Sequence, residues 1–230
     1  MARSLRKVPG GFIYHVLNRA NGRVNIFDKD ADYLAFERVL ADVQARLPMR
    51  ILAWCLMPNH WHLVLWPTLD GSLSDFMRLV TVTHAQRWHA HRASIGTGHL
   101  YQGRFKSFIV QQDAHLLTVC RYVERNALRA NLVRRAEEWR WGSLCRAHHD
   151  KMHEPPRLEP WPVPRARDWI EYVNRPQTPA EIEAVRRCVQ RSAPYGEARW
   201  VRRTADLLGL ESALRPRGRP RKGCTTEKGS

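Results

Sequence analysis

A short motif near the middle of the chain holds two histidines separated by one bulky residue. His60, Trp61 and His62 lie in the stretch 57–66, whose apolar and aromatic residues are typical of a β-strand. Successive side chains of a strand face opposite sides of a sheet, so the two imidazoles share a face and Trp61 points into a core. Two imidazoles on one rigid element can bind one metal ion, but an isolated pair is also compatible with two ordinary structural histidines.

A second polar pair lies on a helix predicted over residues 114–129. Tyr122 and Asn126 are four residues apart, so they share one face of this helix. That face is polar, and a tyrosine on it fits a core role poorly. A tyrosine hydroxyl is a weak nucleophile that becomes effective when it is activated. The alternative interpretation is a solvent-exposed tyrosine without a chemical role.

Basic side chains accompany both motifs. Arg104 and Lys106 share a face of the strand predicted over residues 103–110, which we expect to lie beside the histidine strand. We interpret them as phosphate contacts, with a solvated basic strand face as the alternative. The same two interpretations apply to three arginines around Tyr122: Arg121, Arg125 and Arg129. His15, on the first predicted strand, is interpreted as a structural histidine rather than a ligand.

The composition favours a polyanionic partner in a reducing compartment. Lys and Arg number 38 against 22 Asp and Glu, which gives a net charge of +16, and this excess points first to nucleic acid. A membrane surface is disfavoured because no basic amphipathic helix, lipidation signal, signal peptide or bilayer-spanning apolar run is found. The five scattered cysteines argue against a disulfide scaffold or a zinc ribbon. We therefore expect a cytoplasmic, nucleoid-associated protein.

Apolar periodicity predicts the order β-α-β-β-α-β-α. Pro58-Asn59 is a tight turn, so the strands on either side of it should form an antiparallel hairpin. The predicted strands cover residues 12–18, 49–56, 60–66 and 103–110, and the predicted helices cover 28–47, 73–93 and 114–129. This order predicts an α+β fold. We expect a ferredoxin-like (RRM-like) antiparallel sheet with helices on one face, plus the helix that carries Tyr122, in a domain spanning residues 1–150.

The composition changes after this domain. Residues 151–178 are rich in proline and predict a semi-rigid linker, and residues 179–214 predict a small helical extension. Residues 215–230 form a basic tail that we expect to be flexible. Its Arg-Gly-Arg-Pro sequence resembles an AT-hook core, which places arginines in the minor groove of A·T-rich duplex DNA. Minor-groove binding and nonspecific phosphate attraction are the two interpretations for Arg217, Arg219 and Arg221.

Taken together, these motifs resemble one protein family. The order of a His-hydrophobe-His strand and a later Tyr-x-x-x-Asn helix is similar to that of the single-tyrosine nucleases. The closer resemblance is to the REP-associated tyrosine transposases of bacteria, and it covers residues 8–145 as well as the basic tail. The segments that carry it are MPNHWH at 57–62, GRFKS at 103–107 and YVERNALRANLV at 122–133.

The resemblance implies a metal-dependent endonuclease and strand transferase that acts on single-stranded DNA at palindromic, hairpin-forming repeats. Tyr122 would attack a phosphodiester and leave a 5′-phosphotyrosine link and a free 3′-hydroxyl, without a nucleotide cofactor. His60, His62 and Asn126 would hold a divalent cation. This donor set suits Mg²⁺ or Mn²⁺, and imidazole ligation also fits Zn²⁺. Related insertion-sequence transposases are dimers that donate the tyrosine helix in trans, whereas the REP-associated group favours a monomer.

Two other functions remain open from the sequence. One is a protein that binds hairpins or structured DNA without catalytic activity, with His60 and His62 structural. The other is a hydrolytic metalloenzyme that acts on RNA or nucleotides, with Tyr122 as a bystander. The absence of an evident Asp or Glu general base beside the histidines disfavours the hydrolase.

Overall fold

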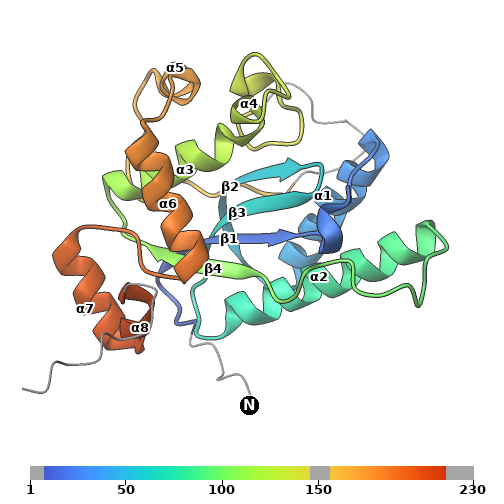
Figure 1. Ribbon diagram of the computed structural model, residues 1–230, viewed down its shortest axis with the longest axis horizontal. Helices are drawn as coiled ribbons and strands as arrows, with labels where there is room; N and C mark the ends of the chain where they lie inside the picture. The colour runs from blue at the N-terminus through green and yellow to red at the C-terminus, as the bar shows by residue number, and fades with distance from the viewer. Residues whose placement is uncertain (1–7, 146–155, 216–230) are drawn as a thin grey trace, which may run out of the picture.

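The computed structural model describes residues 8–145 and 156–215, and its centre is a four-stranded antiparallel sheet (Figure 1). The strand order is β2-β3-β1-β4, which is the arrangement of a ferredoxin-like split βαβ fold. The predicted α+β fold is therefore confirmed. The strands are β1 (Ile13–Arg19), β2 (Arg50–Met57), β3 (His60–Trp66) and β4 (Lys106–Val110).

Eight α-helices and two short 3₁₀ turns (η1, Asn21–Arg23; η2, Ala136–Glu138) surround this sheet in the described ranges. The helix predicted over residues 114–129 is interrupted at Arg125. None of these helices combines the length and apolar character needed to cross a bilayer. The helices are α1 (Asp30–Arg46), α2 (Ser72–His91), α3 (Ala114–Glu124), α4 (Asn126–Arg129), α5 (Trp169–Asn174), α6 (Pro179–Arg191), α7 (Ala198–Leu208) and α8 (Glu211–Leu214).

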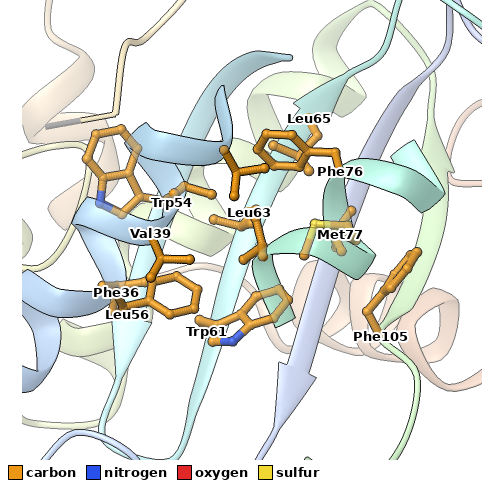
Figure 2. Packing of buried hydrophobic residues seen from close by; sticks show 14 of the residues in the cluster. Phe36, Val39, Trp54, Leu56, Trp61, Leu63, Leu65, Phe76, Met77 and Phe105 are labelled. Atoms are coloured by element: carbon orange, nitrogen blue, oxygen red, sulfur yellow. The ribbon is translucent and has the colours of Figure 1, made fainter. Parts of the chain in front are cut away.

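Each face of the sheet has its own hydrophobic core. Helices α1 and α2 pack on one face, where Trp61, Leu63 and Leu65 of β3 meet Phe36 of α1 and Phe76 of α2 (Figure 2). Helices α3, α5 and α6 contribute to the second core on the opposite face. The alternation of strand side chains explains the division, since neighbouring residues of β3 belong to different cores. The predicted arrangement, with two helices on one face and the tyrosine helix added, agrees with this structure.

The proline-rich segment is not a linker over its described part, so this prediction is wrong for residues 156–178. Trp161 donates a hydrogen bond from Nε1 to the Leu52 carbonyl at 2.8 Å, and Trp169 donates to Glu124 Oε2 at 2.7 Å. Trp169 is also buried in the second core. These two aromatic side chains attach the segment to β2 and to α3, and residues 179–214 follow as part of the same packed unit.

Segments that follow α3 pair with both outer strands of the sheet. On the β2 side, Cys55 bridges to Gly142 and Ile51 bridges to Leu158. On the β4 side, Tyr195 accepts a hydrogen bond from Gln111 N at 2.9 Å and donates its own N–H to the Ile109 carbonyl at 2.8 Å. The carboxyl-terminal part of the chain therefore completes the sheet at each side.

Candidate active site

The β2–β3 hairpin positions the two histidines. His60 begins β3 opposite Arg19 of β1, and His62 lies opposite Leu17. Both imidazoles face the side of the sheet that α3 covers, with ring centroids 5.0 Å apart. Trp61 is fully buried on the other face. The shared face predicted from strand alternation is present.

Hydrogen bonds orient both imidazoles. His60 Nδ1 lies 2.6 Å from Asn59 Oδ1, an oxygen that can only accept, so the proton is on Nδ1 and the lone pair is on Nε2. His62 Nδ1 lies 2.9 Å from His15 Nε2. When His62 donates in this pair, its Nε2 also carries a lone pair. Such outer hydrogen bonds are the usual way in which proteins orient histidine ligands.

The environment keeps these histidines neutral. Burial, with a further contribution from Arg19, lowers the pKa of His60 to about 3. Burial and the neighbouring His60 lower the pKa of His62 well below its usual value. Burial and the charge of Arg129 likewise lower the pKa of His15 to about 3. The neutral form of imidazole is the one that binds metal ions.

Tyr122 extends from α3 toward the histidines. Its ring centroid lies 5.9 Å from that of His62, and the guanidinium of Arg129 lies 4.1 Å from the ring. The prediction of a solvent-facing tyrosine needs a correction, because Tyr122 is only 6% exposed. It nevertheless borders an open groove rather than being enclosed by a core. Tyr122 and both histidines thus line the same groove and are accessible to a substrate bound there.

Asn126 completes the cluster from α4. Its Oδ1 accepts a hydrogen bond from Arg129 Nη2 at 2.8 Å, and its Nδ2 has no partner among the described residues. The break at Arg125 does not separate it from Tyr122, since both side chains border the same groove. An amide oxygen has two lone pairs, so Oδ1 can accept from Arg129 and still face a cation.

Three side chains of this cluster, His60, His62 and Asn126, could together bind a metal ion. Within residues 8–145 and 156–215 there is no group of at least three His, Cys, Asp or Glu side chains that could hold one. His60, His62 and Asn126 instead offer two neutral imidazoles and an amide, which leaves positions for phosphate and water. This composition fits a divalent cation that is bound together with an anionic substrate.

The groove beside Tyr122 has a volume of about 700 Å³ and is strongly cationic. No Asp or Glu of the described residues lines it. None of its cationic side chains forms an ion pair within the described part of the chain. These side chains are Arg19, Arg104, Lys106, Arg129 and Arg186. A groove of this kind is suited to a polyanion.

The basic residues predicted from the sequence therefore divide into groups. Arg104, Lys106 and Arg129 line the groove, although Arg104 precedes β4 and does not share its face with Lys106. Arg121 and Arg125 have a different role: they donate hydrogen bonds to backbone carbonyls of residues 173–176 and hold α5 in place. Arg217, Arg219 and Arg221 lie outside the described residues, and their contact with DNA stays a prediction.

Sequence reasoning missed four residues of this site: His15, Arg19, Arg186 and Gln190. His15 and Arg19 reach it because β1 lies next to β3. Only the order of the strands in the sheet would have predicted that these two residues lie near His62. A local sequence motif does not give this order. Arg186 and Gln190 come from α6, more than fifty residues after Tyr122.

A family model and two solved structures are similar to this chain. A family model described as "Transposase IS200 like" matches residues 10–126, about half of the chain. A solved structure of a REP-associated tyrosine transposase bound to a REP hairpin has a TM-score of 0.50 and 19% identity, and the match covers 62% of this chain and 82% of that one. At this identity the similarity shows a shared fold.

A crystal structure of a putative transposase from Deinococcus radiodurans R1 has a TM-score of 0.38 and 18% identity, with coverage of 54% of this chain and 95% of that chain. No curated protein matches the chain significantly.

Proposed function

Because the chain belongs to the family of IS200-like transposases, we propose that it cuts and rejoins single-stranded DNA beside hairpin-forming palindromic repeats. The proposed reaction is a transesterification on Tyr122. The observation that carries the proposal is the position of the Tyr122 ring beside two neutral imidazoles, in a cationic groove that no described carboxylate lines.

The reaction needs no external energy source. Tyr122 Oη attacks the scissile phosphorus, a bond forms between this oxygen and phosphorus, and the bond from phosphorus to the 3′ oxygen breaks. The tyrosine hydroxyl loses a proton and the leaving 3′ oxygen gains one. The product is a 5′-phosphotyrosine and a free 3′-hydroxyl. Attack by another 3′-hydroxyl reverses the same steps and joins new ends.

His60, His62 and Asn126 are the side chains that would hold a divalent cation, with Mg²⁺ or Mn²⁺ expected. The bound cation would polarise the scissile phosphate and offset the charge that develops on it. Arg129 is placed to assist, because its guanidinium contacts both the Tyr122 ring and Asn126 Oδ1. The arginines that line the groove repel a free cation, and the anionic DNA offsets their charge, so the cation and the DNA should strengthen each other's binding.

A single chain supplies the whole proposed site. The Tyr122 ring centroid lies 5.9 Å from that of His62 of the same chain, and both side chains line the same groove. This geometry supports a monomer that acts in cis. The lack of a carboxylate among the described residues of the groove supports the nuclease over a hydrolase that uses a Glu or Asp general base.

The direct test is covalent capture of DNA. The full chain is incubated with hairpin oligonucleotides that carry single-stranded flanks, labelled at either the 5′ or the 3′ end, in Mg²⁺, Mn²⁺, Zn²⁺ or EDTA. We expect a protein–DNA adduct on a denaturing gel that needs the metal and retains the label from the 3′ side of the cut.

Two variants make the test specific. Tyr122→Phe should abolish the adduct and leave DNA binding intact, because only the nucleophilic oxygen is removed. Tyr172→Phe, a change on α5 where the ring stacks on Arg121, should form the adduct normally. If the protein binds the hairpin tightly but forms no adduct with any of the three metals, a DNA-binding protein without catalytic activity is favoured. If Tyr122→Phe still forms the adduct, Tyr122 is not the nucleophile.

A further inference from the structure

Helix α6 lies outside residues 10–126, which the family model matches, yet it forms part of the groove wall. Arg186, Val189 and Gln190 of this helix line the same groove as Tyr122. Their spacing of three and four residues places them on one side of α6. Arg186 and Gln190 are both exposed.

Three attachments fix α6 against the domain. At its beginning, the carboxylate of Glu181 lies 3.8 Å from the guanidinium of Arg121 on α3. In its middle, Val185 and Cys188 are buried in the second core. After its end, Tyr195 pairs with β4 through backbone hydrogen bonds. Because the buried side faces the core, the side with Arg186 is held toward the groove.

Two like charges, Arg129 and Arg186, line this part of the groove. Arg129 is held by its hydrogen bonds to Asn126 and to the Tyr122 carbonyl. The nearby charge of Arg186 contributes, after burial, to a lowered pKa of Arg129. No described carboxylate lines the groove to neutralise either guanidinium. An anion between them would satisfy both, and a phosphodiester has the charge and acceptor oxygens to do so.

We propose that Arg186 on α6 binds a backbone phosphate of the single-stranded DNA that enters the groove, next to the phosphodiester presented to Tyr122. Gln190, one turn further along α6, adds an amide contact to the same strand. The inference rests on the proposed function, since the strand that Tyr122 cuts is the one expected in the groove. Helix α6 is then a DNA-positioning element of the site.

Salt dependence of binding tests this contact without any chemistry. The full chain carrying Tyr122→Phe is titrated with a hairpin that has a single-stranded flank, over a range of salt concentrations. The slope of log affinity against log salt is negative, and each lost phosphate contact to a single strand reduces its magnitude by about 0.7. Arg186→Gln should therefore make the slope less steep by about 0.7 and weaken binding about three- to tenfold.

Matched variants separate position from charge. Arg187→Gln removes the same charge from the next, outward-facing position of α6, outside the groove lining. It should leave the slope unchanged, and Arg186→Lys should restore most of the slope lost in Arg186→Gln. Equal effects of the changes at Arg186 and Arg187, or the same loss on a blunt hairpin without a flank, would overturn the proposal.

Adduct formation in the otherwise unchanged protein distinguishes this inference from the proposed function. Arg186→Gln should raise the DNA concentration that gives half of the maximal adduct rate and leave the rate at saturating DNA within about twofold. Failure of the unchanged protein to form an adduct would count against the proposed function. If Arg186→Gln and the unchanged protein have the same half-saturating DNA concentration, the proposed role of α6 in DNA binding is contradicted, and the proposed function is unaffected.

Discussion

The two faces of β3 differ in what lies beside their polar groups. On the α1–α2 face, Trp61 donates from Nε1 to the Tyr101 hydroxyl at 3.1 Å, and this hydroxyl lies 2.6 Å from His84 Nδ1. On the other face, Asn126 borders an open groove, and its Nδ2 has no partner among the described residues. Unpartnered buried atoms also occur on the α1–α2 side, at Trp54 Nε1 and Arg92 Nε, but these residues do not line the groove. A buried polar atom beside an open groove is one that a ligand can satisfy.

Charge pairing shows the same contrast. On the α1–α2 side, Arg87 pairs with Asp42 and Arg92 pairs with Asp28 across the two helices. The cations of the groove have no such carboxylates in the described ranges. The charges on one side of the sheet are thus paired within the fold, and the positive charge of the groove on the other side is left for a partner. The predictions below separate stability from activity along this division.

The largest effect is expected from removing a proposed metal ligand. His62→Ala should lower the rate of adduct formation by about a thousandfold or more, because the cation supplies several kcal/mol of charge stabilisation in the transition state. The midpoint of thermal unfolding should change little, because His62 borders the open groove and its truncation leaves no enclosed cavity. The initial adduct rate in Mg²⁺ and a thermal melt give both quantities, and an active His62→Ala would remove the histidine from the ligand set.

The neighbouring residue should show the opposite behaviour. Trp61 is fully buried beside Phe36 and Leu63 (Figure 2). The Tyr101 ring also packs edge-on against it, with ring centroids 6.1 Å apart. Trp61→Ala should lower the free energy of unfolding by about 3–5 kcal/mol, because it leaves a large cavity in the core. Urea unfolding followed by circular dichroism measures this change. A loss below about 1 kcal/mol would mean that the two faces of β3 do not differ as described.

His15 should affect the apparent affinity for Mg²⁺, because it is hydrogen-bonded to His62. His15→Leu removes the acceptor for His62 Nδ1, and the Mg²⁺ concentration for half of the maximal adduct rate should rise about 10- to 100-fold. His15→Gln keeps an acceptor near the position of Nε2 and should restore most of the affinity. If both variants behave alike while remaining folded, His15 is the purely structural histidine that the sequence indicated.

The Tyr101 hydroxyl links two buried groups on the stable face. Tyr101→Phe would leave Trp61 Nε1 and His84 Nδ1 without a partner, and should cost about 1–3 kcal/mol of stability. The adduct rate of the folded variant should stay unchanged. A control is Tyr172→Phe, whose hydroxyl is outside this network, and comparable stability losses in the two variants would argue against the network.

The smallest expected effect is the change in the free energy of unfolding with pH that His84 causes. Burial lowers the pKa of His84 from 6.5 in the unfolded chain to about 3 in the folded protein. Between these values only the unfolded chain takes up the proton, so stability falls as pH falls below about 6.5. From about pH 7.5 to about pH 5.5 this group should remove about 1 kcal/mol.

Urea unfolding of the metal-free protein at the two pH values measures this loss. His84→Asn keeps an acceptor for Tyr101 and should show a pH dependence that is weaker by that amount. An unchanged dependence would mean that His84 is accessible to protons in the folded state.

Local spacing was sufficient to predict part of this site. The shared face of His60 and His62 follows from strand alternation, and that of Tyr122 and Asn126 from the helical repeat, which survives the break at Arg125. Spacing failed for Arg121, because its partners are carbonyls of residues 175 and 176, whose position depends on how a later segment packs.

Long-range pairing accounts for most of the remaining differences. The proline content of residues 156–178 suggested a linker, but Trp161 and Trp169 attach this segment to the sheet and to α3. Arg186 lies in the groove because α6 packs on β4, and nothing near Tyr122 in the sequence indicates this contact. The roles of Tyr122, His60, His62 and Asn126 stay predictions until the adduct is tested.

The pairing of later segments with both outer strands has a consequence for shortened forms of the protein. Gly142 and Leu158 pair with β2, and Tyr195 pairs with β4. A chain cut down to residues 10–126 would retain all four proposed catalytic side chains but would expose the backbone N–H and C=O groups of two outer strands. Unpaired strands of this kind associate with one another and aggregate. The carboxyl-terminal segments thus act as built-in protection against self-association.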